Sequence, residues 1–303
     1  MTSIAEALDS SIEQISRRRE KSTTRQTSSG TLGGHDVCPA CKGTGWMSII
    51  DKDGCETFKK CDCGLLKKSI CESRRECSGI PEKYKDARLS RFSLDVYGQD
   101  GSRELIDFTY ACIQCWLRDF EEMELKGMGL YLFSGTPGSG KTFMAACLAN
   151  ELIRENGKRV RFATSMDIIE EIKRSWDFSS GYSESHVLQE LTDTDILIID
   201  DFGVERPKDW IAERFYQIIN ARYALKKITI ITSNLSVEDL KYDSRIKNRV
   251  QERTYQLPFP EESIRGQIAK ENMSDMMNRV KMLREQQSHQ NEQLTLKLDT
   301  QNG

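Results

Sequence analysis

The feature that most constrains this chain is a glycine-rich segment between an apolar stretch and an amphipathic one. It matches the pattern G-x-x-x-x-G-K-[ST] and reads Gly135-Thr136-Pro137-Gly138-Ser139-Gly140-Lys141-Thr142. The flanking residues predict a buried strand before it and a helix after it. Glycines at these positions let successive N–H groups surround phosphate, and the helix N-terminus adds positive potential. The segment therefore predicts a nucleoside triphosphate site, with Lys141 on the β- and γ-phosphates and Thr142 as a ligand of Mg²⁺.

Polar residues follow two later apolar stretches. Asp200 and Asp201 come directly after 196–199, and Asn234 follows 228–232. We expect Asp200 to associate with Mg²⁺ and Asp201 to orient or activate the attacking water. Two acids could also form a turn or cap a helix, but the upstream P-loop favours the nucleotide site. Asn234 would reach the γ-phosphate and the water if the two strands are neighbours.

Apolar strands alternate with helices from residue 80 to residue 285, which predicts an α/β domain with a parallel sheet covered on both faces. Strands are expected over residues 130–133, 159–163, 195–199, 228–232 and 254–257. Helices are expected over residues 103–123, 143–154, 167–175, 184–191, 209–223, 243–252 and 262–284. Residues 286–303 are polar, lack apolar periodicity and are expected to be disordered.

Seven of the ten cysteines lie between residues 38 and 77, which predicts a separate small module over residues 35–79. Two close pairs suit a tetrahedral zinc site with four thiolate ligands. These ligands are Cys38, Cys41, Cys61 and Cys63. Cys55 could substitute for one of them, and His35 is a further contender. Cys71 and Cys77 have no assigned role, and the cysteines on predicted helices are expected to be buried thiols, namely Cys112, Cys115 and Cys147.

The first residues predict a tethered amphipathic helix. Apolar side chains recur at helical spacing within residues 1–21, at Ile4, Leu8, Ile12 and Ile15. Residues 22–34 lack large apolar side chains and predict a flexible linker. A helix this small has no core of its own, so it needs a groove on a partner or on the chain's own nucleotide-binding domain.

Composition excludes some partners and compartments. The chain has 44 Lys plus Arg and 47 Asp plus Glu, and its net charge of -3 argues against a protein that binds nucleic acid through its overall charge. No apolar run approaches the roughly 18 residues needed to span a bilayer. Glu6 and Asp9 stand where a signal peptide would be basic and then apolar, so we expect a cytoplasmic protein.

Basic and aromatic residues nevertheless occur together in two segments, which suits phosphate contact and base stacking on single-stranded DNA. Either segment could instead be a solvated face or contain core aromatics. The candidates are Lys173, Arg174, Trp176, Phe178, Lys208 and Trp210.

Several motifs in order resemble the DnaC/DnaI-type replicative helicase loaders of the AAA+ class. Besides the P-loop they are Asp200-Asp201-Phe202-Gly203, Thr232-Ser233-Asn234, the arginine-rich residues 243–249 and Ser263-Ile264-Arg265. The resemblance covers about residues 36–285. It implies an AAA+ P-loop fold with a five-stranded sheet in the order 5-1-4-3-2, ATP as the nucleotide, and Asn234 as the residue that senses the γ-phosphate.

The resemblance also implies partners and arginine roles. Arg249 is the best candidate for an arginine finger acting on ATP held by a neighbouring subunit, with Arg245 as runner-up, and Arg265 would contact nucleotide in its own chain. The implied partners are a hexameric DnaB-like helicase, met by the zinc module and the first helix, and single-stranded DNA. Members of the AAA+ class commonly carry Glu where this chain has the shorter Asp201, so we expect slow, switch-like hydrolysis.

Two rival functions remain open. An IstB-like transposition helper has nearly the same ATPase motifs but would not be expected to carry the cysteine module. A DnaJ-like zinc scaffold would explain the Cys-x-x-Cys-x-Gly-x-Gly sequence that begins at Cys38. Only one such repeat is present, and the scaffold would leave the P-loop without a role.

Overall fold

The structure is a computed structural model that describes residues 38–50, 52, 55–177, 181, 183–205, 208–266, 269–270 and 272–284. The predicted first helix (1–21), the linker (22–34) and the tail (286–303) lie outside these residues. The chain divides into two compact units, one up to Leu66 and one from Lys67 onward. Within the described residues, no helix is both long enough and apolar enough to cross a membrane.

The first unit is built on an antiparallel hairpin of β1 (Trp46–Ile50) and β2 (Glu56–Lys60), in which Trp46 pairs with Lys60. Nearly every residue of the two strands is exposed, so the hairpin buries almost no apolar core. A two-stranded hairpin is marginally stable in water unless something else supports it. The support must come from outside the strands, where the cysteines lie.

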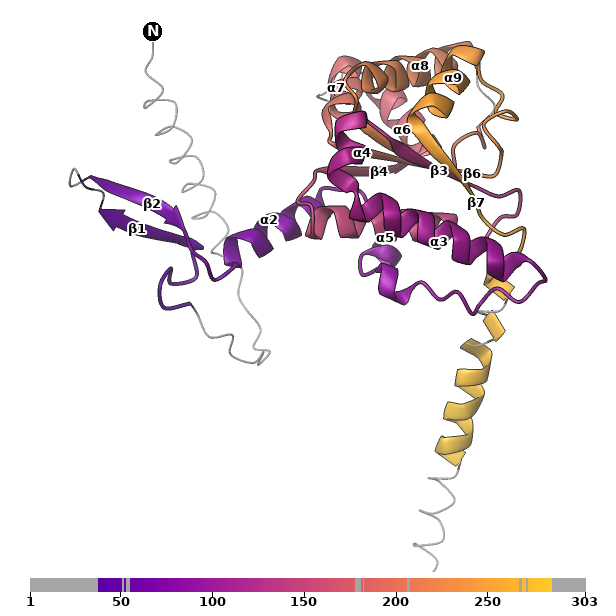
Figure 1. Cartoon of the computed structure of the whole chain (residues 1–303), viewed down its shortest axis with the longest axis horizontal. Coiled ribbons are helices and arrows are strands. Elements are labelled where there is room, and N and C mark those ends of the chain that lie inside the picture. Colours follow the sequence, from indigo (N-terminus) through magenta and orange to yellow (C-terminus); the bar gives the residue numbers. More distant parts are fainter. Residues whose placement is uncertain are drawn as a thin grey trace, which may run out of the picture. The chain divides into compact units, whose positions relative to one another are not determined.

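The second unit contains a five-stranded parallel sheet (Figure 1). Its strands are β3 (Gly129–Phe133), β4 (Val160–Thr164), β5 (Ile196–Asp200), β6 (Ile228–Ser233) and β7 (Thr254–Pro258). Their order across the sheet is β4-β5-β6-β3-β7. Read from the other edge and numbered from the first strand of the sheet, this order is 5-1-4-3-2, so the predicted topology is confirmed.

Alternate residues of each strand serve two separate cores, as the period of two in a β-strand requires. On β5, Ile196 and Ile198 face one core, whereas Leu197 and Ile199 face the other. Helices α3 and α5 cover the first face, and α6 to α9 cover the second, as Figure 1 shows for α3 and α5 against α7, α8 and α9. Strands buried on both faces explain the continuous apolar runs in the sequence.

The helices mostly match their predicted ranges. They are α2 (Leu65–Glu76), α3 (Ser102–Arg118), α4 (Phe120–Lys126), α5 (Lys141–Arg154), α6 (Ser165–Arg174), α7 (Glu184–Asp193), α8 (Asp209–Ala224) and α9 (Ser244–Arg253), with short 3₁₀ turns η1 (Glu82–Tyr84) and η2 (Leu89–Arg91). Residues 272–284 are also helical.

The prediction of one helix over 103–123 is wrong, because the chain breaks at Asp119 between α3 and α4. No Pro or Gly marks this break. It lets Phe120 enter the core, where its ring packs edge to face on Trp116 at 5.4 Å between centroids. Tertiary packing therefore decides the break.

Candidate nucleotide site and cysteine cluster

The glycine-rich segment forms the turn from β3 into α5, as its sequence predicts. Gly138 and Gly140 have φ values of +85° and +99°, a region that L-residues with side chains rarely adopt. A Cβ at Gly140 would also lie 2.6 Å from the hydroxyl oxygen of Tyr97, which donates a 2.7 Å hydrogen bond to the Ser139 carbonyl. The loop thus requires glycine for its backbone conformation and for the approach of Tyr97.

Lys141 is the first residue of α5, and its side chain is buried against the loop. Its Nζ donates to the carbonyl oxygens of Ser134 at 3.1 Å and Thr136 at 3.3 Å, and to Ser139 Oγ at 3.1 Å. Burial lowers the pKa of Lys141, although the nearby acids Asp201, Glu261 and Asp200 oppose the shift. The ammonium group is thereby held inside the turn that the motif assigns to phosphate.

Asp200 is the last residue of β5 and is almost fully buried. Its Oδ1 accepts hydrogen bonds from Thr142 Oγ1 at 3.0 Å and from Thr232 Oγ1 at 2.6 Å. Burial raises the pKa of Asp200, while both hydroxyls favour its ionised form. Thr142 and Asp200, the two predicted magnesium ligands, are therefore brought together. Oxygen ligands of this kind suit Mg²⁺.

Asp201 follows in a left-handed conformation with φ of +53°, uncommon for a residue other than Gly. Its N–H donates to Thr232 Oγ1 at 2.9 Å, and its carbonyl accepts from Ser165 Oγ at 3.0 Å. The side chain is exposed beside the buried Asp200. This geometry suits a residue that meets water at the edge of the site.

Asn234 and Arg265 reach the same edge of the sheet. Asn234 directly follows β6, which pairs with both β3 and β5. The strand that ends in Asp200 and the strand that precedes Asn234 are therefore neighbours, as the predicted role of Asn234 requires. The Ile264 N–H donates to the Gly138 carbonyl at 3.1 Å, and a Cβ at Gly138 would lie 2.9 Å from Arg265 Cδ. Arg265 therefore lies against the P-loop of its own chain.

Sequence reasoning missed a carboxylate that supports the loop. Glu261 accepts from the Gly135 N–H at 2.7 Å and from Thr136 Oγ1 at 2.8 Å. Burial alone would raise the pKa of Glu261, but these hydrogen bonds outweigh it and lower the pKa. The predicted strand order already indicated this contact, because it places the last strand of the sheet (β7) beside the first (β3) and so brings the residues after β7 to the P-loop.

The two finger candidates lie on α9 and contact α8. Arg249 donates to Asn220 Oδ1 at 2.8 Å, and its guanidinium lies over the rings of Tyr216 and Tyr223 at 5.1 and 5.5 Å. Arg245 also stacks on Tyr216, at 4.7 Å, but keeps 64% of its side chain exposed. The arginines thus form a stacked row with the tyrosines of α8.

The two segments predicted to contact DNA converge, because Trp210 lies against Trp176 and Lys173 of the earlier segment. Trp176 and Trp210 pack edge to face at 4.9 Å between ring centroids, and Lys173 Nζ lies 5.9 Å from the Trp210 ring. Trp176 keeps 48% of its surface exposed. Arg174 pairs with Glu170 at 3.6 Å, Lys208 is exposed before α8, and Phe178 lies outside the described residues.

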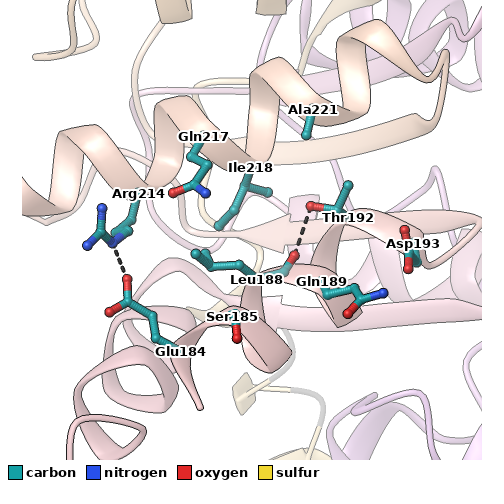
Figure 2. A pocket seen from close by; sticks show the side chains of 10 residues that line it. All are labelled: Glu184, Ser185, Leu188, Gln189, Thr192, Asp193, Arg214, Gln217, Ile218 and Ala221. Carbon is teal, nitrogen blue, oxygen red and sulfur yellow. Dashed lines mark hydrogen bonds and ion pairs between the residues drawn. The ribbon is translucent and has the colours of Figure 1, made fainter.

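A cavity of about 550 Å³ opens between α7 and α8, with Leu188 and Ile218 among the residues that line it (Figure 2). At one end Glu184 pairs with Arg214, and Glu184 Oε2 also accepts from Trp176 Nε1 at 2.7 Å. No P-loop residue lines this cavity. It adjoins the tryptophan pair and is separate from the nucleotide site.

The hairpin of the first unit brings the two cysteine pairs together. Cys38 and Cys41 precede β1 and Cys61 and Cys63 follow β2, and their four sulfurs lie within 4.8 Å of one another. Cys38 and Cys61 Sγ are 3.8 Å apart, and Cys41 and Cys63 Sγ are 3.6 Å apart. A tetrahedral zinc with Zn–S bonds of ~2.3 Å needs sulfurs about 3.8 Å apart. The cluster therefore fits zinc.

The sheet order, the P-loop and the acidic strand end define an AAA+ P-loop protein. The family model of the "IstB-like ATP binding protein" matches residues 129–250. The replicative helicase loader DnaC of Buchnera aphidicola (subsp. Baizongia pistaciae) is 27% identical over 164 residues, 54% of this chain and 62% of that protein. DnaC of Escherichia coli K12 is 34% identical over 110 residues, 36% of this chain and 44% of that protein.

A solved structure of a candidate primosome component from Streptococcus pyogenes serotype M3 has the same fold, with a TM-score of 0.50 and 22% identity over 64% of this chain and 97% of that chain. Residues 129–250 thus match the model of an IstB-like ATP-binding protein, and parts of the chain are similar to DnaC helicase loaders, in agreement with the resemblance that its motifs show. It spans less than two thirds of the length of the DnaC proteins it matches.

Proposed function

We propose that this chain is an ATP-dependent loader that places a hexameric replicative helicase on single-stranded DNA. The observation that carries the proposal is the P-loop site with Lys141, Asp200 and Arg265 in one chain, in a domain similar to curated helicase loaders. Such a site binds a triphosphate and can respond to its hydrolysis, because the γ-phosphate contacts residues from several strands.

In this proposal Thr142 and Asp200 hold Mg²⁺ on the phosphates, and Asp201 orients the attacking water. Its side chain is one methylene shorter than Glu, so the water must come closer or bind through a further group. Hydrolysis is therefore slow and acts as a switch between helicase-bound and released states. Asn234, after the strand beside the P-loop, senses the γ-phosphate.

The arginines of α9 act on a neighbouring subunit. Arg249 is steadied by Asn220 and two tyrosine rings, so little side-chain entropy remains to be lost when it meets a phosphate. Arg245 is more exposed and stays the runner-up. Either role requires self-assembly of the chain, with ATP at the interface.

Single-stranded DNA stacks on the exposed Trp176 beside Trp210, with Lys173 as a phosphate contact. The helicase is contacted by the cysteine module, whose hairpin exposes large apolar side chains at Trp46, Ile50 and Phe58. Zinc held by the four cysteines supplies the stability that this hairpin lacks. The loader works in the cytoplasm, where thiols stay reduced.

A pull-down tests the proposal. The tagged full-length chain is mixed with the hexameric replicative helicase of the same organism, with ATP, ADP or no nucleotide. We expect capture that depends on the nucleotide for the wild type and loses this dependence in Lys141→Ala. Lys158→Ala, which removes an ion pair with Glu124 outside the P-loop, serves as the matched control.

The second candidate function is an IstB-like transposition helper, favoured by the name of the matching family model. The paired cysteines argue against it, since such a helper is not expected to carry them. No capture of helicase in any nucleotide state would favour this alternative.

A further inference from the structure

A buried carboxylate outside the predicted site lies in the loop after β5. Glu205 is only 6% exposed, and its carboxylate oxygens accept hydrogen bonds from three donor groups. The donors are the Gly203 N–H at 3.1 and 3.2 Å, Ser165 Oγ at 2.6 Å and the hydroxyl of Tyr242. Burying a carboxylate is costly unless it is well hydrogen-bonded, so this cluster is specified by the sequence and not incidental.

The first connection of Glu205 is to Asp201. The one hydroxyl proton of Ser165 is shared between two acceptors, Glu205 Oε2 at 2.6 Å and the carbonyl oxygen of Asp201 at 3.0 Å. Gly203, which donates to Glu205, belongs to the same turn and has φ of +91°. Asp201 itself adopts the left-handed region, which persists only when surrounding contacts hold it. Glu205 contributes to this hold indirectly, through Ser165 and Gly203.

The second connection is to α9. The Tyr242 hydroxyl donates to Glu205, and its ring stacks on Phe202 at 4.8 Å between centroids with an interplanar angle of 3°. Asp243, the next residue, caps the N-terminus of α9, which carries Arg245. Burial and the charge of Glu205 raise the pKa of Tyr242, so its hydroxyl remains a donor at neutral pH.

We propose that Glu205 is a positioning residue for ATP hydrolysis, holding Asp201 in its turn and joining that turn through Tyr242 to the start of α9. The inference rests on the proposed ATPase function. Asp201 reaches less far than Glu, so the orientation of its backbone decides where its carboxylate meets water. A change at Glu205 therefore alters the chemical step and leaves the phosphate contacts of Lys141 intact.

The test compares kcat and KM for ATP hydrolysis by the full chain with Mg²⁺, together with the affinity for a fluorescent ATP analogue and the Tm. Glu205→Gln places an amide donor among three donors, and Tyr242→Phe removes one hydroxyl while keeping the stacked ring. We expect kcat to fall at least tenfold in Glu205→Gln and at least threefold in Tyr242→Phe, with KM and affinity within twofold of wild type. Tyr110→Phe, which loses a hydroxyl bond to the Leu89 carbonyl on another face, should keep wild-type kcat.

The double variant separates positioning from mere stability. If the pair acts as a unit, Glu205→Gln with Tyr242→Phe lowers kcat by less than the product of the single effects. A lowered Tm with unchanged kcat per folded molecule would overturn the inference, and if Glu205→Gln does not fold, unchanged kcat in Tyr242→Phe does so. A wild type without ATP hydrolysis would overturn the proposed function, and this inference with it.

Discussion

The buried guanidinium of Arg222 on α8 offers the sharpest test of how the domain is held together. The side chain has no exposed surface. Its five N–H groups are shared among six acceptors, which are five backbone carbonyls at the end of α7 and the starts of β5 and β6, and the hydroxyl of Thr229. Three of these carbonyls, at Leu191, Thr192 and Thr194, lie at the C-terminus of α7, where a helix leaves acceptors without intrahelical donors. Arg222 therefore caps α7 and ties it to the sheet.

Replacing Arg222 with Met keeps much of the volume and removes every donor. Each lost hydrogen bond costs a net ~0.5–1.5 kcal/mol, whereas the variant no longer buries a charged group, which offsets part of that cost. We therefore expect the free energy of unfolding to fall by about 3–5 kcal/mol. Urea unfolding of the full chain, followed by circular dichroism, measures this loss.

Matched variants make the result interpretable. Arg222→Lys keeps the charge with fewer donors and should fall between Met and wild type. Arg174→Ala, which removes an exposed pair with Glu170, should cost less than about 0.5 kcal/mol. A loss below about 1 kcal/mol in Arg222→Met would refute the view that this arginine caps α7.

Three further predictions concern the sites. Cys61→Ser, or a strong chelator, should release one zinc per chain and lower the thermal stability of the hairpin unit, as measured by metal analysis and proteolysis. Thr232→Val removes a hydroxyl that favours ionised Asp200, so the pKa of Asp200 should rise further. As the pH is lowered, the variant should therefore lose ATP hydrolysis at a higher pH than wild type does. Trp176→Ala should weaken binding of single-stranded DNA by about 1–3 kcal/mol in fluorescence anisotropy titrations.

Each of these predictions has a control. Of the three helix cysteines expected to be buried, only Cys147 is; Cys112 is half-buried and Cys115, on α3, is exposed. Cys115→Ser should therefore retain zinc and stability, and zinc loss from both variants alike would contradict the Cys61 assignment. If the low-pH loss of ATP hydrolysis occurs at the same pH in Thr232→Val as in wild type, ionisation of Asp200 does not cause that loss. Phe108→Ala, at an exposed aromatic of α3, should leave DNA affinity unchanged, and an equal loss in both aromatic variants would argue against a specific stacking site.

Much of the fold follows from local sequence because strands buried on both faces and the P-loop have strong signatures. The strand order came from the resemblance. The break at Asp119 has no local signal, since the burial of Phe120 against Trp116 creates it. Long-range contacts decide such features, so local periodicity cannot find them.

The site was predictable to the extent that its residues end strands. Lys141, Thr142 and Asp200 were named from motifs and do converge. Thr232 was quoted within a motif but given no role, and Glu261 was missed, although both positions follow from the strand order, because β6 and β7 flank β3. Glu205 lies in a loop, and only the folded structure shows its contacts with Ser165 and Tyr242.

The central claim is that ATP held by this chain drives the loading of a helicase. The most direct measurement is the amount of hexameric helicase retained on circular single-stranded DNA after incubation with the chain and ATP. We predict that wild type raises this amount well above helicase alone and that Lys141→Ala does not. Equal retention with wild type, with Lys141→Ala and without the chain would contradict the claim.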